Sequence, residues 1–178
     1  ANTVNSSGGY VPNSSTSPPW GAGPQPSNWS PVTQVANTDP AFFNFDNWTG
    51  LNHQRSRVTN MEITDGASNT YLVGEKYLSP DSYLSGKDPG DGVSILSGAD
   101  YDLHRWTTYS ASTPTAYSPL RDRRGVTAYM IFGSAHASGF NMALCDGSVR
   151  TINFNIDPQL HSNLGCRNDR NTIDPSGF

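Results

Sequence analysis

Two strand-like runs joined by Asp146-Gly147 occupy residues 140–154, which read FNMALCDGSVRTINF. The run from Phe140 to Cys145 alternates in the way that is typical of a strand with one buried face. Asp-Gly between two such runs is the strongest short signal for a β-hairpin, because a type I′ turn needs a positive φ at both central residues. Residues 140–154 therefore predict two antiparallel strands.

The second strand and the segment after it carry further signals. Val149 and Ile152 do not keep a period of two, so we expect a β-bulge near residues 150–151 that restores one apolar face. Asp157-Pro158 then predicts a short helix, with Asp as the N-cap and Pro in the first turn. Gly165 is expected to end this helix.

Upstream, Asp65-Gly66 predicts a turn, and residues 70–75 (TYLVGE) form a β-branched and aromatic strand pattern. Residues 79–92 are rich in Pro, Gly, Ser and Asp, and residues 107–125 in Pro, Ser, Thr and Arg, which is typical of loops. We expect an α+β fold that is mostly β: an antiparallel sheet with long irregular loops and a short C-terminal helix.

The composition divides the chain into an arm and a domain. Residues 1–40 are dominated by Asn, Ser, Thr, Pro and Gly without any period, so they predict an irregular arm. Trp20 and Trp29 are unusual in a linker, and they favour an arm that packs on the domain or docks on a neighbour. Residues 41–178 are expected to form a single β-rich globular domain.

Charge and hydropathy exclude some partners. The net charge is −4 and charged residues make up 15% of the chain, so nothing predicts nucleic-acid binding. The one basic cluster, Arg121, Arg123 and Arg124, is interpreted as a solvated loop. No apolar run approaches the ~20 residues of a membrane helix. This composition favours a protein that lies outside the cell or on its surface, and the start at Ala1 favours a processed or truncated product.

The two cysteines leave two alternatives open. A bridge between Cys145 and Cys166 would close a loop of about twenty residues and add roughly 3 kcal/mol of stability. The alternative is a pair of buried free thiols.

Two motifs resemble those of a known family. Residues 65–78, DGASNTYLVGEKYL, are similar to the central motif of a prepilin-like family of unknown function that is expanded in planctomycetes. His136, followed by nine residues and then Asp146-Gly147, resembles its C-terminal signature. The resemblance implies a pilin-like unit that self-associates in a filament or lattice. The apolar N-terminal helix of the family is absent from this sequence, so the part present is expected to be mostly β.

His136 and Asp146 are not expected to share a catalytic site. A six-residue strand between them places them ~20 Å apart. We therefore interpret Asp146 as setting the hairpin turn, Gly147 as required by its backbone geometry, and His136 as capping a loop. Asp65-Gly66 belongs to the same set of structural motif residues.

A second polar cluster is a candidate calcium site. Asp100, Asp102 and His104 stand at alternate positions, and Asp88 and Asp91 precede them. The four carboxylates offer oxygen ligands to Ca²⁺, which takes about six to eight. The alternative is a polar strand face without a metal. No other cofactor is expected.

The sequence contains no Gly-x-Ser-x-Gly elbow, no phosphate-binding glycine loop and no His-Glu-x-x-His motif. Glu75-Lys76 is interpreted as an ion pair at the end of a strand, and Ser134 beside His136 does not make a nucleophile–base pair. The sequence therefore predicts a non-catalytic structural subunit in which Trp20 and Trp29 dock on a neighbour. The alternative is a calcium-assisted module that binds a glycan or a small solute, and a hydrolase is the least favoured hypothesis.

Overall fold

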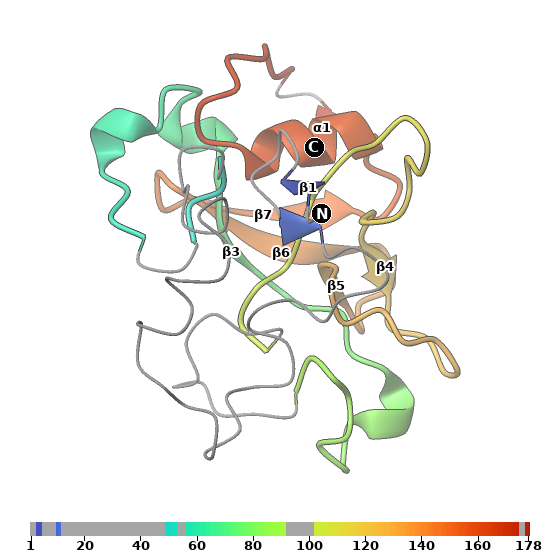
Figure 1. The fold of residues 1–178 in the computed structure, drawn as a ribbon. Helices are drawn as coiled ribbons and strands as arrows, with labels where there is room; N and C mark the ends of the chain where they lie inside the picture. Colours follow the sequence, from blue (N-terminus) through green and yellow to red (C-terminus); the bar gives the residue numbers. More distant parts are fainter. Residues whose placement is uncertain (1–2, 5–9, 12–48, 53–55, 92–101, 175–176) are drawn as a thin grey trace, which may run out of the picture.

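The fold is centred on a three-stranded antiparallel sheet in the order β3–β6–β7 (Figure 1). The computed structural model describes residues 3–4, 10–11, 49–52, 56–91, 102–174 and 177–178. The strands are β3 (Tyr71–Gly74), β6 (Gly139–Leu144) and β7 (Val149–Asn153). Helix α1 (Pro158–Gly165) lies against one face of this sheet. The predicted class, α+β and mostly β with a short C-terminal helix, is confirmed.

The remaining elements are short. Two further strand pairs are antiparallel β1 (Thr3–Val4) with β2 (Tyr10–Val11), and parallel β4 (Leu120–Arg121) with β5 (Gly133–Ser134). Three 3-10 helices are η3 (Asn60–Glu62), η4 (Ala67–Asn69) and η5 (Pro80–Ser82). In the described part of the chain, none of the helices has the length and apolar character needed to cross a membrane.

The core lies between the sheet and α1. Its members are the fully buried side chains of Phe140, Met142, Leu144, Ile152 and Leu164, with Tyr71, Ile156 and Ile173 around them. Strand β6 contributes three of them from alternate positions, because successive side chains of a strand point to opposite faces. The central strand therefore supplies most of the apolar area of the core.

The predicted bulge near residues 150–151 is wrong. The pairing of β6 with β7 is regular from Gly139 to Ala143, and the irregularity lies instead on β3, between Tyr71 and Val73. Arg150 takes the inward position on β7, and its guanidinium carbon lies 4.8 Å from the centre of the Phe178 ring. This cation–π contact lets β7 keep its period of two with a charged residue facing inward.

The hairpin is present, but its turn is not type I′. A type I′ turn would need a positive φ at Asp146 as well as at Gly147. Gly147 has φ 85°, but Arg170 is the only non-glycine residue with a positive φ in the described part of the chain. The Gly147 amide donates to the Leu144 carbonyl at 3.0 Å. This is a three-residue loop that ends in a left-handed glycine, the next most common hairpin connection.

The sequence predicted the N-terminal cap of α1 correctly, but not the reason for Gly165 at its C-terminal end. The Asp157 carboxylate accepts a hydrogen bond from the Leu160 amide at 2.8 Å, which confirms the predicted N-cap. Gly165 does not end the helix through a positive φ. A Cβ at this position would lie 2.0 Å from Thr107 Oγ1, so the glycine is required by close packing instead.

Candidate functional site

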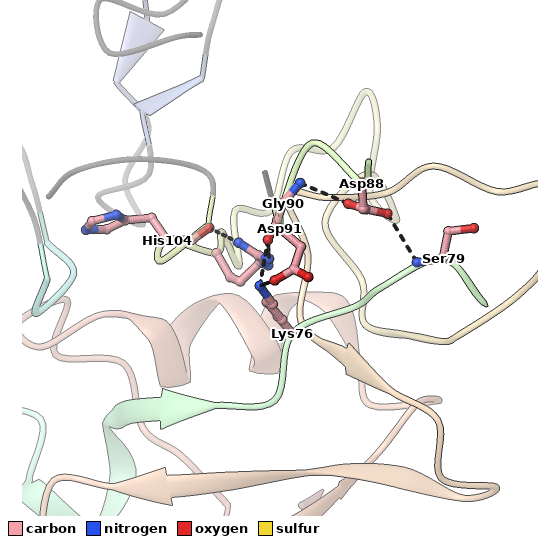
Figure 2. A network of polar contacts seen from close by, with 7 residues as sticks. Lys76, Ser79, Asp88, Gly90, Asp91 and His104 are labelled. Atoms are coloured by element: carbon pink, nitrogen blue, oxygen red, sulfur yellow. Dashed lines mark hydrogen bonds and ion pairs between the residues drawn. The ribbon is translucent and has the colours of Figure 1, made fainter. Parts of the chain in front are cut away.

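A polar network joins the end of β3 to two loops (Figure 2). Lys76 Nζ donates to the Gly90 carbonyl at 2.6 Å and forms an ion pair with Asp91 Oδ1 at 2.8 Å. Arg105 Nη2 also donates to the Gly90 carbonyl, at 3.4 Å, and its Nη1 donates to the His104 carbonyl at 2.7 Å. Two cations therefore converge on one turn of the 79–91 loop.

Asp88 is the buried anion of this network. Its Oδ1 accepts from the Gly90 amide at 2.9 Å and its Oδ2 from the Ser79 amide at 3.2 Å. Burial lowers the pKa of Arg105 to about 10, and the charges of Asp102, Asp88 and Asp91 oppose this effect. The cation and the carboxylates thus compensate for each other's loss of hydration.

The described residues of the predicted calcium site are not arranged as metal ligands. Asp88, Asp91 and Asp102 do gather around Arg105, while Asp100 lies outside the described residues. The His104 ring points away from Asp91 (Figure 2). In the described ranges no group of three or more His, Cys, Asp or Glu is placed to hold a metal ion. These contacts favour a polar network, and a calcium site that includes Asp100 stays a prediction.

Replacing Asp88 with asparagine tests the network. An amide has one acceptor oxygen, so Asp88→Asn leaves one of the Ser79 and Gly90 amides without its acceptor, and we expect a loss of about 1–3 kcal/mol in unfolding free energy. Asp91→Asn is the control, because its exposed ion pair is worth about 0–1 kcal/mol. Urea titrations measure both. Equal losses, or a melting temperature that rises with added Ca²⁺, would contradict this account.

The predicted ion pair between Glu75 and Lys76 is wrong, because Lys76 pairs with Asp91 and Glu75 with His136. Adjacent side chains of an extended segment point to opposite sides. Glu75 Oε1 lies 3.2 Å from His136 Nε2, and its Oε2 accepts from the Asn141 amide at 2.6 Å. Glu75 therefore connects β3 to β6 through the Asn141 amide, and it also binds His136 in the loop before β6.

Ser134 does not face the imidazole of His136. Its hydroxyl donates to the Gly139 carbonyl at 2.8 Å and accepts from the His136 amide at 3.1 Å. The Ser134 side chain is buried, whereas that of His136 is largely exposed. A nucleophile whose proton is shared with a base needs the ring nitrogen within hydrogen-bond reach, and this arrangement lacks that contact.

Asp146 lies in the turn at the other end of β6 from His136. Its Oδ1 accepts from the Ser148 hydroxyl at 2.6 Å and from the Ser148 amide at 2.8 Å, and these bonds lower the pKa of Asp146. The Asp65 carboxylate accepts from the amides of Asp169 (2.7 Å) and Arg170 (2.9 Å). Gly66 follows with φ 96°. These motif residues hold turns and the C-terminal tail in place.

The basic loop is fixed by carboxylates. Arg124 pairs with Asp81 at 3.2 Å, and the Asp122 carboxylate accepts from the Leu78 amide at 3.1 Å. The side chains of Arg121 and Arg123 are exposed. The loop is ordered by its acidic neighbours, and its arginines face the solvent.

A buried histidine on α1 was missed by the sequence analysis. His161 Nδ1 lies 3.2 Å from the Tyr71 hydroxyl, and the rings of Phe132 and Phe140 meet it edge to face. Burial lowers the pKa of His161 to about 3, so the ring is neutral, and burial raises the pKa of Tyr71. The available signal was its position, three residues before the buried Leu164 on the same face of α1.

Both cysteines are free thiols in the structure. Cys145 Sγ lies 3.8 Å from the Tyr71 carbonyl, and Cys166 Sγ lies 3.3 Å from Thr49 Oγ1. Burial raises their pKa values to about 11 and about 12. Neither thiol is therefore activated as a nucleophile at neutral pH.

The outer face of the sheet, opposite α1, carries an apolar row. Val73 of β3 and Val149 of β7 both pair with Ala143 of β6, so the three side chains lie side by side. Val73 is 64% exposed and Val149 is 67% exposed, and Leu72 at the bulge is 54% exposed. Trp20 and Trp29, predicted to dock on a neighbour, lie outside the described residues.

The fold and these contacts define a small, mostly β domain whose polar groups hold loops and turns together. A family model described as "Protein of unknown function (DUF1559)" matches residues 2–159. The chain belongs to this family. No curated protein matches the chain. No solved structure matches it either.

Proposed function

We propose that this chain is a non-catalytic, extracellular structural protein, a pilin-like subunit of a surface filament or cell-surface assembly. The observation that carries the proposal is the apolar row Leu72, Val73, Ala143 and Val149 on the outer face of the sheet. Removing such side chains from water stabilises association by roughly 25 cal/mol per Å² of apolar surface, before the costs of binding are counted.

The polar sites support a structural role. The Asp88, Glu75 and Ser134 side chains each bond to backbone groups, and the thiols have raised pKa values. A catalytic group needs a free acid, base or nucleophile beside a place for the substrate. The low charge of the chain and its family motifs favour a position outside the cell. Trp20 and Trp29 remain predicted docking residues of the assembly.

Association of the full chain tests the proposal. We expect sedimentation to show larger species as the concentration rises. Val73→Lys is expected to weaken association at least tenfold, because it places a charge within the apolar row. Leu84→Lys is the matched control, since Leu84 is fully exposed in the 79–91 loop, away from the sheet.

Two results would contradict the proposal. One is a chain that stays monomeric at every concentration, and the other is an equal effect of Val73→Lys and Leu84→Lys. A monomer would favour a binding module for a glycan or small solute, in which Ca²⁺ assists. Screening the chain against glycans with and without Ca²⁺ would then be the next step.

A further inference from the structure

Among the described residues, no strand pairs with the outer edge of β7. Leu144 and Ser148 form a hydrogen-bonded pair at the start of the hairpin, with Leu144 N donating to Ser148 O at 2.8 Å. Bonded and non-bonded pairs alternate in an antiparallel ladder. Arg150 and Ile152 therefore bond to β6, and the backbone groups of the residues between them point away from the sheet.

Three residues present these outward groups: Val149, Thr151 and Asn153. In the part of the chain that the structure describes, the N–H and C=O groups of Val149 and Thr151 have no partner on this side, and the Asn153 carbonyl accepts from Ile156. All three side chains are exposed and uncharged. The edge thus offers alternating donors and acceptors without a charge that would repel another strand.

The opposite edge of the sheet is different. Strand β3 is interrupted by the irregularity between Tyr71 and Val73, and bulges of this kind make an edge a poor template for a further strand. On β7 the one charged side chain, Arg150, points inward over the Phe178 ring. Of the two edges, β7 is therefore the one suited to pairing.

We propose that two copies of this chain pair antiparallel through their β7 edges, with Thr151 facing Thr151 of the second copy. The outward groups of an antiparallel edge are self-complementary about such a centre, which places Val149 opposite Asn153 of the second copy. The resulting six-stranded sheet has a two-fold axis, the commonest symmetry of homo-oligomers. The inference rests on the proposed self-association and names the strand that makes the joint.

The two-fold axis also extends the proposed function. It runs perpendicular to the sheet, so it keeps both outer faces on one side and both α1 helices on the other. The apolar rows around Val73 and Val149 of the two copies then lie on one continuous surface. This doubles the apolar surface that a further layer of subunits can cover.

A charge swap at the centre of the pairing tests the inference. Thr151→Lys and Thr151→Asp each place like charges opposite each other in the pair, and like charges directly opposite are destabilising. We expect each variant to weaken pairing at least tenfold in sedimentation. An equal mixture of the two variants is expected to restore it, because Lys then faces Asp. Leu84→Lys and Leu84→Asp are the controls, and they should neither weaken pairing nor restore it in a mixture.

Amide exchange gives a second readout that needs no substitution. In paired chains the amides of Val149 and Thr151 should become protected at high concentration, while those of Arg150 and Ile152 are protected at every concentration. Association without this change, or without any effect of the Thr151 charges, would overturn the β7 pairing and leave the proposed function standing. A chain that never associates would overturn both.

Discussion

Phe140→Ala is expected to lower the unfolding free energy by about 3–5 kcal/mol. Phe140 is fully buried on the central strand. Its ring stacks with Phe132 at 6.0 Å and with Phe154 at 6.3 Å between centroids. Because Phe132 directly precedes β5 and Phe154 directly follows β7, the substitution leaves a cavity where three segments meet.

Urea unfolding followed by circular dichroism measures this loss. Val149→Ala is the matched control, since it removes an exposed apolar side chain from the other face of the same hairpin, and it is expected to change stability by about 0.5 kcal/mol or less. Similar losses for the two variants would mean that the core does not lie between β6 and α1.

Acid is expected to destabilise the protein through His161. The folded-state pKa of His161, about 3, lies below its ordinary value of 6.5, so the neutral ring contributes stability that is fully present above pH 6.5. That contribution is lost as the pH falls from 6.5 toward 3, by roughly 1.4 kcal/mol per pH unit. We expect unfolding to become easier by about 2 kcal/mol between pH 7 and pH 5.

His161→Gln removes the titration and keeps a polar group near the Tyr71 hydroxyl. This variant is expected to be less stable at pH 7 and to lose little more between pH 7 and pH 5. Leu84→Gln serves as the control, because the fully exposed Leu84 side chain lies outside the core and its replacement should leave the acid slope of the unchanged protein in place. An unchanged acid slope in His161→Gln would show that other groups cause the acid sensitivity.

Local patterns in the sequence predicted the central hairpin, the strand β3 and the N-cap of α1. Each depends on residues close together in the chain, such as Asp146-Gly147 in its turn and Asp157 before Pro158. The position of the bulge was wrong because the sequence does not show that Arg150 finds an aromatic partner in Phe178, 28 positions later in the chain. The irregularity in the sheet lies on β3 instead, between Tyr71 and Val73.

The candidate sites show the same limit. Of the carboxylates interpreted as calcium ligands, Asp91 pairs with Lys76 and Asp88 accepts from the amides of Ser79 and Gly90, and no local rule gives those pairings. His161 was missed because a histidine on a short helix is ordinary until Tyr71 and Phe140 of the sheet enclose it. Packing between distant segments decides both cases.

Negative-stain electron microscopy of the protein purified from its native source is the most direct test of a structural subunit, with mass spectrometry to define the N-terminus of the purified chain. The account predicts ordered filaments or lattices whose repeat contains pairs of subunits. Dispersed small particles of single-chain size would contradict it.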